Sequence, residues 1–188
     1  MMRNDMSKLT IARRGLLLTG FPALAVAQPE SVSAAKAVSL FATGVNVGNG
    51  ADLTEDTLQS YTLPANRLAN VGDMLRITAG GSFAGTTDSK NARVRFGAAV
   101  LSAPGGSAAS TVRWSVIANL VKTSASNQSY TTLGAVLNGP AASGMASGTA
   151  TVIDTAPILI SVTGQNVTSA VAGSITCQFF SVEFIGAP

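Results

Sequence analysis

The sequence contains no histidine and only one cysteine, Cys177. The absence of histidine removes the commonest general base, the commonest metal ligand and the side chain that most often changes its charge near neutral pH. A single cysteine excludes an internal disulfide and any zinc site built from several cysteines. Cys177 alternates with Ile175 and Phe179, so we expect it to be a small buried core residue.

Charged residues are also scarce, at 11% of the chain, which is less than half the usual share. Four of the 12 basic residues and one of the 9 acidic residues lie in residues 1–27, so this leader carries the whole net charge of +3. The remaining chain holds eight of each sign and is neutral. Such a body has no basic excess with which to neutralise phosphates, so nucleic acid is not a predicted partner. Its surface must be covered by small polar residues or by other subunits.

The leader, residues 1–27, joins basic residues to an apolar stretch, 15–27, that is too short to cross a bilayer as a helix. Arg13-Arg14 followed by leucines resembles a twin-arginine export signal, and Ala25–Ala27 resembles a signal-peptidase site. An export signal would place the remaining chain in the periplasm or outside the cell. The alternative is a short apolar arm or helix that anchors the protein to a virion or to a neighbouring subunit. The residues leave both alternatives open.

Beyond an Ala- and Ser-rich linker, residues 28–37, the chain divides into short β-favouring runs separated by Gly, Pro, Asn and Asp. We expect one domain over residues 38–188. The predicted strands are Val38–Val45, Thr57–Leu63, Met74–Ala79, Ala92–Leu101, Thr111–Thr123, Gln128–Leu137, Thr149–Asp154, Pro157–Thr163 and Ile175–Ile185. The predicted connections are Val47–Gly50, Ala79–Gly81, Pro104–Ser107 and Asn138–Gly144. This pattern predicts an all-β fold, an antiparallel β-sandwich of jelly-roll type.

Alternation within the predicted strands indicates which side chains face the core. Val94 and Phe96 point one way, and Arg93 and Arg95 point the other. A second strand has an apolar face made of Val112, Trp114, Val116, Ala118 and Leu120. Its opposite face is half polar, with Arg113, Ser115, Ile117 and Asn119. The alternation of Ile175–Ile185 changes phase near Phe179-Phe180, which predicts a bulge or burial on both faces.

Two groups of charged residues are candidate binding sites. Asp52, Glu55 and Asp56 could bind a hard cation through carboxylate oxygens, but we favour a solvated turn in which Thr54 or Thr57 bonds to the local backbone. Asp73 is predicted to be a turn residue. The second group, Lys90, Arg93 and Arg95, could contact a polyanion or a glycan. We favour pairing of these cations with acids on a neighbouring strand or subunit.

Aromatic side chains on which a sugar could stack are scarce: apart from the phenylalanines, the candidates are Trp114, Tyr61 and Tyr130. We expect Trp114 to be buried in the core and therefore not to serve as such a platform. The many serines lack an activating base, because the sequence has no histidine and no Ser-x-x-Lys run. We therefore predict a non-enzymatic protein without catalytic, metal-binding or cofactor-binding residues.

Three segments resemble a domain found in structural proteins of tailed phages and prophages. They are VGNGADLTEDTLQSYTLPANRLANVGDMLRITAGGSFAG over 47–85, KNARVRFG over 90–97 and ILISVTGQNVTSAVAGSITCQFFSVEFI over 158–185. The resemblance spans most of residues 39–185 and is carried by turn and core residues. It implies a fibre, spike or decoration part of a virion, with a trimeric β-sandwich head on an N-terminal attachment segment.

The expected function is therefore a structural role in a phage virion, as a capsid-surface fibre or decoration protein or a short tail-fibre component. The expected partners are two further copies in a homotrimer and other capsid or tail proteins, which the leader would contact. A host surface glycan is a further candidate partner. The alternative is an exported β-sandwich binding or adhesion protein of a bacterium, in the periplasm or secreted.

Overall fold

The computed structural model describes residues 36–108, 111–137 and 144–187. The regular elements within these ranges are all β-strands, which confirms the all-β prediction. No helix in the described ranges is long and apolar enough to cross a membrane. The leader, with its two alternative interpretations as an arm and as an export signal, lies outside the described residues.

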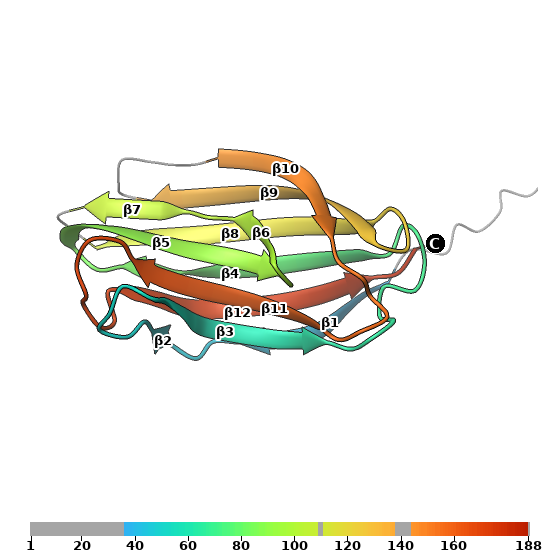
Figure 1. Ribbon diagram of the computed structural model, residues 1–188, viewed down its shortest axis with the longest axis horizontal. Coiled ribbons are helices and arrows are strands. Elements are labelled where there is room, and N and C mark those ends of the chain that lie inside the picture. The colour runs from blue at the N-terminus through green and yellow to red at the C-terminus, as the bar shows by residue number, and fades with distance from the viewer. Residues whose placement is uncertain (1–35, 109–110, 138–143, 188) are drawn as a thin grey trace, which may run out of the picture. The chain divides into compact units, whose positions relative to one another are not determined.

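The strands form two antiparallel sheets (Figure 1). Sheet A has the order β1-β12-β4-β8-β9-β10, with β2 beside β12. Its strands are β1 Ala37–Thr43, β2 Val47–Gly48, β4 Met74–Phe83, β8 Val112–Lys122, β9 Asn127–Leu137, β10 Gly144–Thr151 and β12 Ile175–Ile185. Sheet B has the order β3-β11-β5-β6, with β7 beside β5. Its strands are β3 Glu55–Leu63, β5 Thr86–Phe96, β6 Ala99–Ser102, β7 Gly105–Ala108 and β11 Ile158–Asn166.

The order β1-β12-β4-β8 opposite β3-β11-β5-β6 is that of a jelly roll, two Greek keys folded into a sandwich. The predicted fold class is therefore confirmed. The hairpin β9–β10 is inserted between β8 and β11 in the sequence and extends sheet A past β8. Figure 1 shows this hairpin along the upper edge of sheet A.

The core between the sheets follows the predicted alternation. Val94 and Phe96 are buried, whereas Arg93 and Arg95 point away from the core. The predicted apolar face of β8 is buried along its whole length. Trp114, near the start of β8, packs against Phe83, with 6.2 Å between the ring centroids. Because large aromatic side chains bury the most apolar area, this pair is a main source of core stability.

A bulge in β12 explains its change of phase. The pairing of β12 with β4 shifts register between Cys177 and Phe179. Cys177 is fully buried, as predicted, and burial raises the pKa of its thiol to about 11. After the bulge, Phe180 and Val182 enter the core, and Phe179 is turned to the outer face of sheet A.

Several predicted boundaries were wrong. The predicted strand Ala92–Leu101 is a hairpin, because Gly97 adopts a positive φ of 56° and reverses the chain between β5 and β6. The predicted strand Thr149–Asp154 begins earlier, at Gly144, and ends at Thr151. The connection predicted at Asn138–Gly144 lies almost wholly outside the described residues.

Glycine-rich segments produced the other errors. Ala79–Gly81 was predicted to be a turn but lies inside β4, where Gly80 is covered by the Phe179 ring. Part of the predicted connection Pro104–Ser107 belongs to β7. The predicted turn Val47–Gly50 starts with β2, which pairs with β12. In each case long-range pairing overrides the local preference of glycine for turns.

Candidate interaction surfaces

The three carboxylates of the predicted cation site have separate partners. Asp52 Oδ1 accepts hydrogen bonds from the backbone N–H of Thr54 at 2.8 Å and from its hydroxyl at 2.7 Å. These bonds hold the pKa of Asp52 below its ordinary value. Asp56 Oδ2 accepts from the backbone N–H of Gly50 at 2.8 Å. Glu55 is the first residue of β3 in sheet B. Asp52 and Thr54 do form a local turn, but the acceptor is the Asp52 carboxylate and not the backbone oxygen that was expected for Thr54. Within the described ranges, no group of three His, Cys, Asp or Glu side chains could hold a metal ion.

Glu55 is the centre of an ionic cluster on the outer face of sheet B. Arg95 donates two hydrogen bonds to its carboxylate, each at 2.8 Å. Arg93 lies 3.1 Å from Glu55 Oε2, and the Thr163 hydroxyl donates to Oε1. Since Glu55 is on β3, Thr163 on β11 and both arginines on β5, the cluster ties three neighbouring strands together. The predicted pairing of Arg93 and Arg95 with an acid is confirmed, but the acid is not on the adjacent strand, because Glu55 lies on β3, on the far side of β11 from β5.

Replacing Glu55 with glutamine should lower the free energy of unfolding by about 2 kcal/mol at pH 7, because charge-assisted hydrogen bonds are lost. The Arg95 hydrogen bonds hold the pKa of Glu55 below its ordinary value. Its stabilisation is therefore full above the unfolded-state pKa and is lost as the pH falls through the folded-state pKa. Urea unfolding of both proteins at several pH values should show the difference shrinking from about pH 5 to about pH 3. An equal difference at pH 7 and pH 3 would contradict this account.

Lys90 does not belong with the two arginines. Its side chain is buried at the inner side of β5, and its Nζ donates to Thr86 Oγ1 at 2.6 Å, to Thr86 O at 3.2 Å and to Asp88 O at 2.9 Å. Burial lowers the pKa of Lys90, and the nearby Asp88 opposes that shift. The predicted grouping of Lys90 with Arg93 and Arg95 as one binding surface is thus wrong. The reason is alternation: Lys90 lies two residues before Ala92 and four before Val94, so its side chain shares their inner face, whereas the two arginines point to the outer face.

The outer face of sheet A carries a row of exposed apolar side chains. Ile117 on β8 pairs directly with Leu133 on β9, and Leu133 pairs directly with Met145 on β10. Their exposed fractions are 40%, 50% and 84%. We call these three residues the apolar row. Phe179 and Leu137 add further exposed apolar surface on sheet A. Exposed apolar side chains that are contiguous across several strands are typical of surfaces that bind another molecule.

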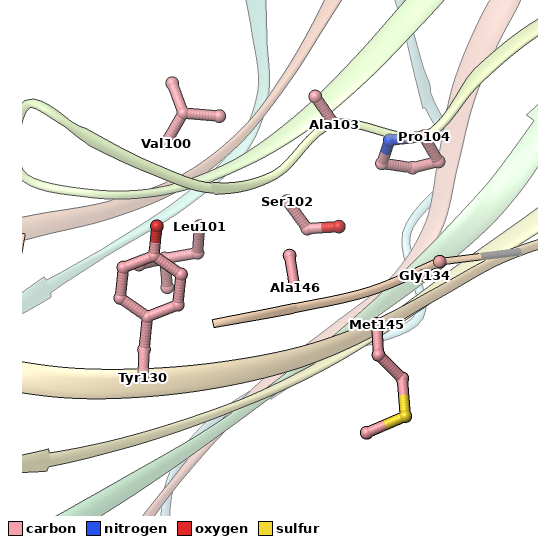
Figure 2. Close-up of a pocket in the computed structure, with 10 residues that line it drawn as sticks. Val100, Leu101, Ser102, Ala103, Pro104, Tyr130, Gly134, Met145 and Ala146 are labelled. Carbon is pink, nitrogen blue, oxygen red and sulfur yellow. The ribbon is translucent and has the colours of Figure 1, made fainter. Parts of the chain in front are cut away.

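A groove of about 410 Å³ lies where the two sheets part, between β6 and the hairpin β9–β10. Figure 2 shows the Tyr130 ring on one side of it, Val100 and Ser102 on the other, and the Met145 side chain pointing away. The Tyr130 ring lies flat over Gly148, where a Cβ would come within 2.6 Å of the phenol oxygen. The groove lining is uncharged and can take an apolar or neutral polar group.

The other two aromatic candidates do not reach this groove's lining. Tyr61 stacks on Phe41, with 5.4 Å between the ring centroids, and Trp114 is buried as predicted. The apolar row and the groove were both missed in the sequence. Ile117 on an otherwise polar strand face was a partial signal of the apolar row. The residues beside it, Leu133 and Met145, follow from the strand register, which the sequence does not reveal.

No protein-family model matches the sequence, and no curated protein matches it. Among solved structures, the chain is similar to the CBM2 module of the evolved Dit of Lactobacillus casei BL23 phage J-1. The two are 10% identical, the match covers 82% of this chain and 99% of that chain, and the TM-score is 0.40. A likeness this distant carries no argument about function.

Proposed function

We propose that the protein is a non-enzymatic structural component of a phage virion that associates with copies of itself. It would be a capsid-surface fibre or decoration protein, or a short tail-fibre component. The apolar row on sheet A is the observation that carries the self-association. The assignment to a virion is supported by the resemblance of the sequence to phage structural proteins, together with the β-sandwich that this resemblance implied.

The outer face of sheet A suits a contact between identical subunits. Ile117, Leu133 and Met145 form an unbroken line across β8, β9 and β10. Charged residues are depleted at the centres of protein interfaces, and the segment 123–153, which contains β9 and β10, has no charged residue. We propose a homotrimer held by this face. The proposed attachment to capsid or tail proteins is through the leader, and a host surface glycan remains a proposed partner of the β-sandwich.

Replacing Leu133 with lysine should dissociate the oligomer. The variant places a charge at the centre of the apolar row, where burial against another subunit would leave it unpaired. The matched control is Leu159→Lys, because Leu159 is 49% exposed on the outer face of sheet B, against 50% for Leu133 on sheet A. At a low protein concentration, at which the trimer is the largest expected assembly, sedimentation equilibrium should give about three chain masses for the wild type and for Leu159→Lys, and one for Leu133→Lys. A wild-type monomer, or an unchanged mass for Leu133→Lys, would contradict the proposed contact.

The virion assignment has its own test. Mass spectrometry of purified phage particles should find the chain among the particle proteins, with peptides from the leader still present. Absence from the particles would overturn the virion assignment. A chain that begins after Ala27 would overturn attachment through the leader and would favour the exported binding protein.

A further inference from the structure

The edge strand β10 is an open site for another β-strand. It ends the strand order of sheet A, and β9 is its one neighbour among the described strands. β10 runs from Gly144 to Thr151 and keeps one register with β9 along its whole length. It contains neither a charged residue nor a proline. A long, regular and uncharged edge offers a row of backbone N–H and C=O groups to a further strand.

The other described edges all carry features that hinder such pairing. β1 has a register shift between Ser39 and Phe41. β3 begins with Glu55 and Asp56, and its pairing with β11 is also shifted. β6 and β7 have four residues each, and β2 has two. Among the described edge strands, β10 alone combines a length of eight residues, an unshifted register and the absence of charge.

A second copy of this chain is the occupant that the charges favour. When two identical strands pair antiparallel about a two-fold axis, a charge close to the axis lies opposite its own copy, and like charges placed opposite each other are destabilising. Residues 123–153 contain no charge, so identical edges can meet without this repulsion. The inward side chains Ala146 and Ala150 are small, and the groove between β6 and β10 leaves room beside them.

We propose that β10 of one copy pairs antiparallel with β10 of a second copy, which joins two sheets A into one continuous sheet. This contact lies at the edge of the sheet, whereas the apolar row occupies its face. The inference rests on the proposed self-association and adds a second, two-fold contact to it. Trimers formed through the face would be linked in pairs through this edge.

The test uses opposite charges on the edge of the full-length protein. Ser147 and Thr149 are both exposed, so substitutions there should leave the fold intact. Ser147→Lys/Thr149→Lys and Ser147→Glu/Thr149→Glu should each halve the mass of the wild-type assembly in sedimentation at high protein concentration. An equimolar mixture of the two variants should recover the wild-type mass, because lysine of one copy then faces glutamate of the other.

The matched control is Ser60→Lys/Thr62→Lys, with the same residue types and spacing on the charged edge strand β3, which should keep the wild-type mass. The edge contact is overturned if both charged β10 variants keep the wild-type mass, or if their mixture does not recover it. Leu133→Lys separates the two proposals. If Leu133→Lys loses mass and the β10 variants do not, the face contact stands and the edge contact fails. If the β10 variants lose mass and Leu133→Lys does not, the face contact fails and the edge contact stands.

Discussion

Replacing Gly81 with alanine is expected to lower the free energy of unfolding by about 4 kcal/mol or more, a large part of the roughly 5–15 kcal/mol that stabilises a typical domain. A Cβ at this position would lie 1.7 Å from the carbonyl oxygen of Thr176 and 2.9 Å from the Trp114 ring. The Thr176 oxygen belongs to the backbone of β12, next to the bulge, so it cannot swing aside as a flexible side chain would. β4 and β12 would have to separate at the centre of sheet A.

Gly44→Ala is the matched control, since a Cβ at Gly44 meets nothing within 4 Å. That change should alter stability by less than about 0.5 kcal/mol, or raise it slightly by restricting the unfolded chain. Urea unfolding followed by tryptophan fluorescence measures both variants, because Trp114 is the one tryptophan and lies beside Gly81. A Gly81→Ala protein within 1 kcal/mol of the wild type would mean that β4 and β12 do not approach this closely.

Alternation is the part of the fold that could be predicted from the sequence. In β8 the inward and outward residues were assigned along the whole strand, because side chains of successive residues must point to opposite faces. The bulge in β12 was visible for the same reason, as a break in that alternation. These signals are local, so they do not depend on which strands become neighbours.

The boundaries and the interaction surfaces depend on neighbours and were missed. β10 has the sequence GMASGTAT, whose small residues give little local preference for a strand, and its pairing with β9 determines where it begins. Gly80 and Gly81 suggest a turn, although β4 needs them for close contact with β12. The ionic cluster was predicted only as a pairing of Arg93 and Arg95 with some acid, because the position of Glu55 across β11 is set by sheet order.

Replacing Lys122 with methionine is expected to lower the free energy of unfolding by about 3–5 kcal/mol, since it leaves a buried carboxylate without its cation. Lys122 lies at the end of β8, and its Nζ is 2.5 Å from Asp154 Oδ2 and 2.5 Å from the carbonyl oxygen of Leu68. These contacts join β8 to the connections β10–β11 and β3–β4. Arg76→Met is the control, because Arg76 and Glu183 form an exposed pair at 3.7 Å, and such pairs contribute less than about 1 kcal/mol.

The double variant Lys122→Met/Asp154→Leu separates the value of the pair from the cost of an unpaired charge. It removes both charges, so the main remaining defect is the Leu68 carbonyl without its donor, which costs about 1–3 kcal/mol. The double variant should therefore be more stable than Lys122→Met alone, with a coupling free energy of about 2 kcal/mol in a double-mutant cycle. If the two changes add independently, Asp154 does not depend on Lys122, and the pair does not close this end of the sandwich.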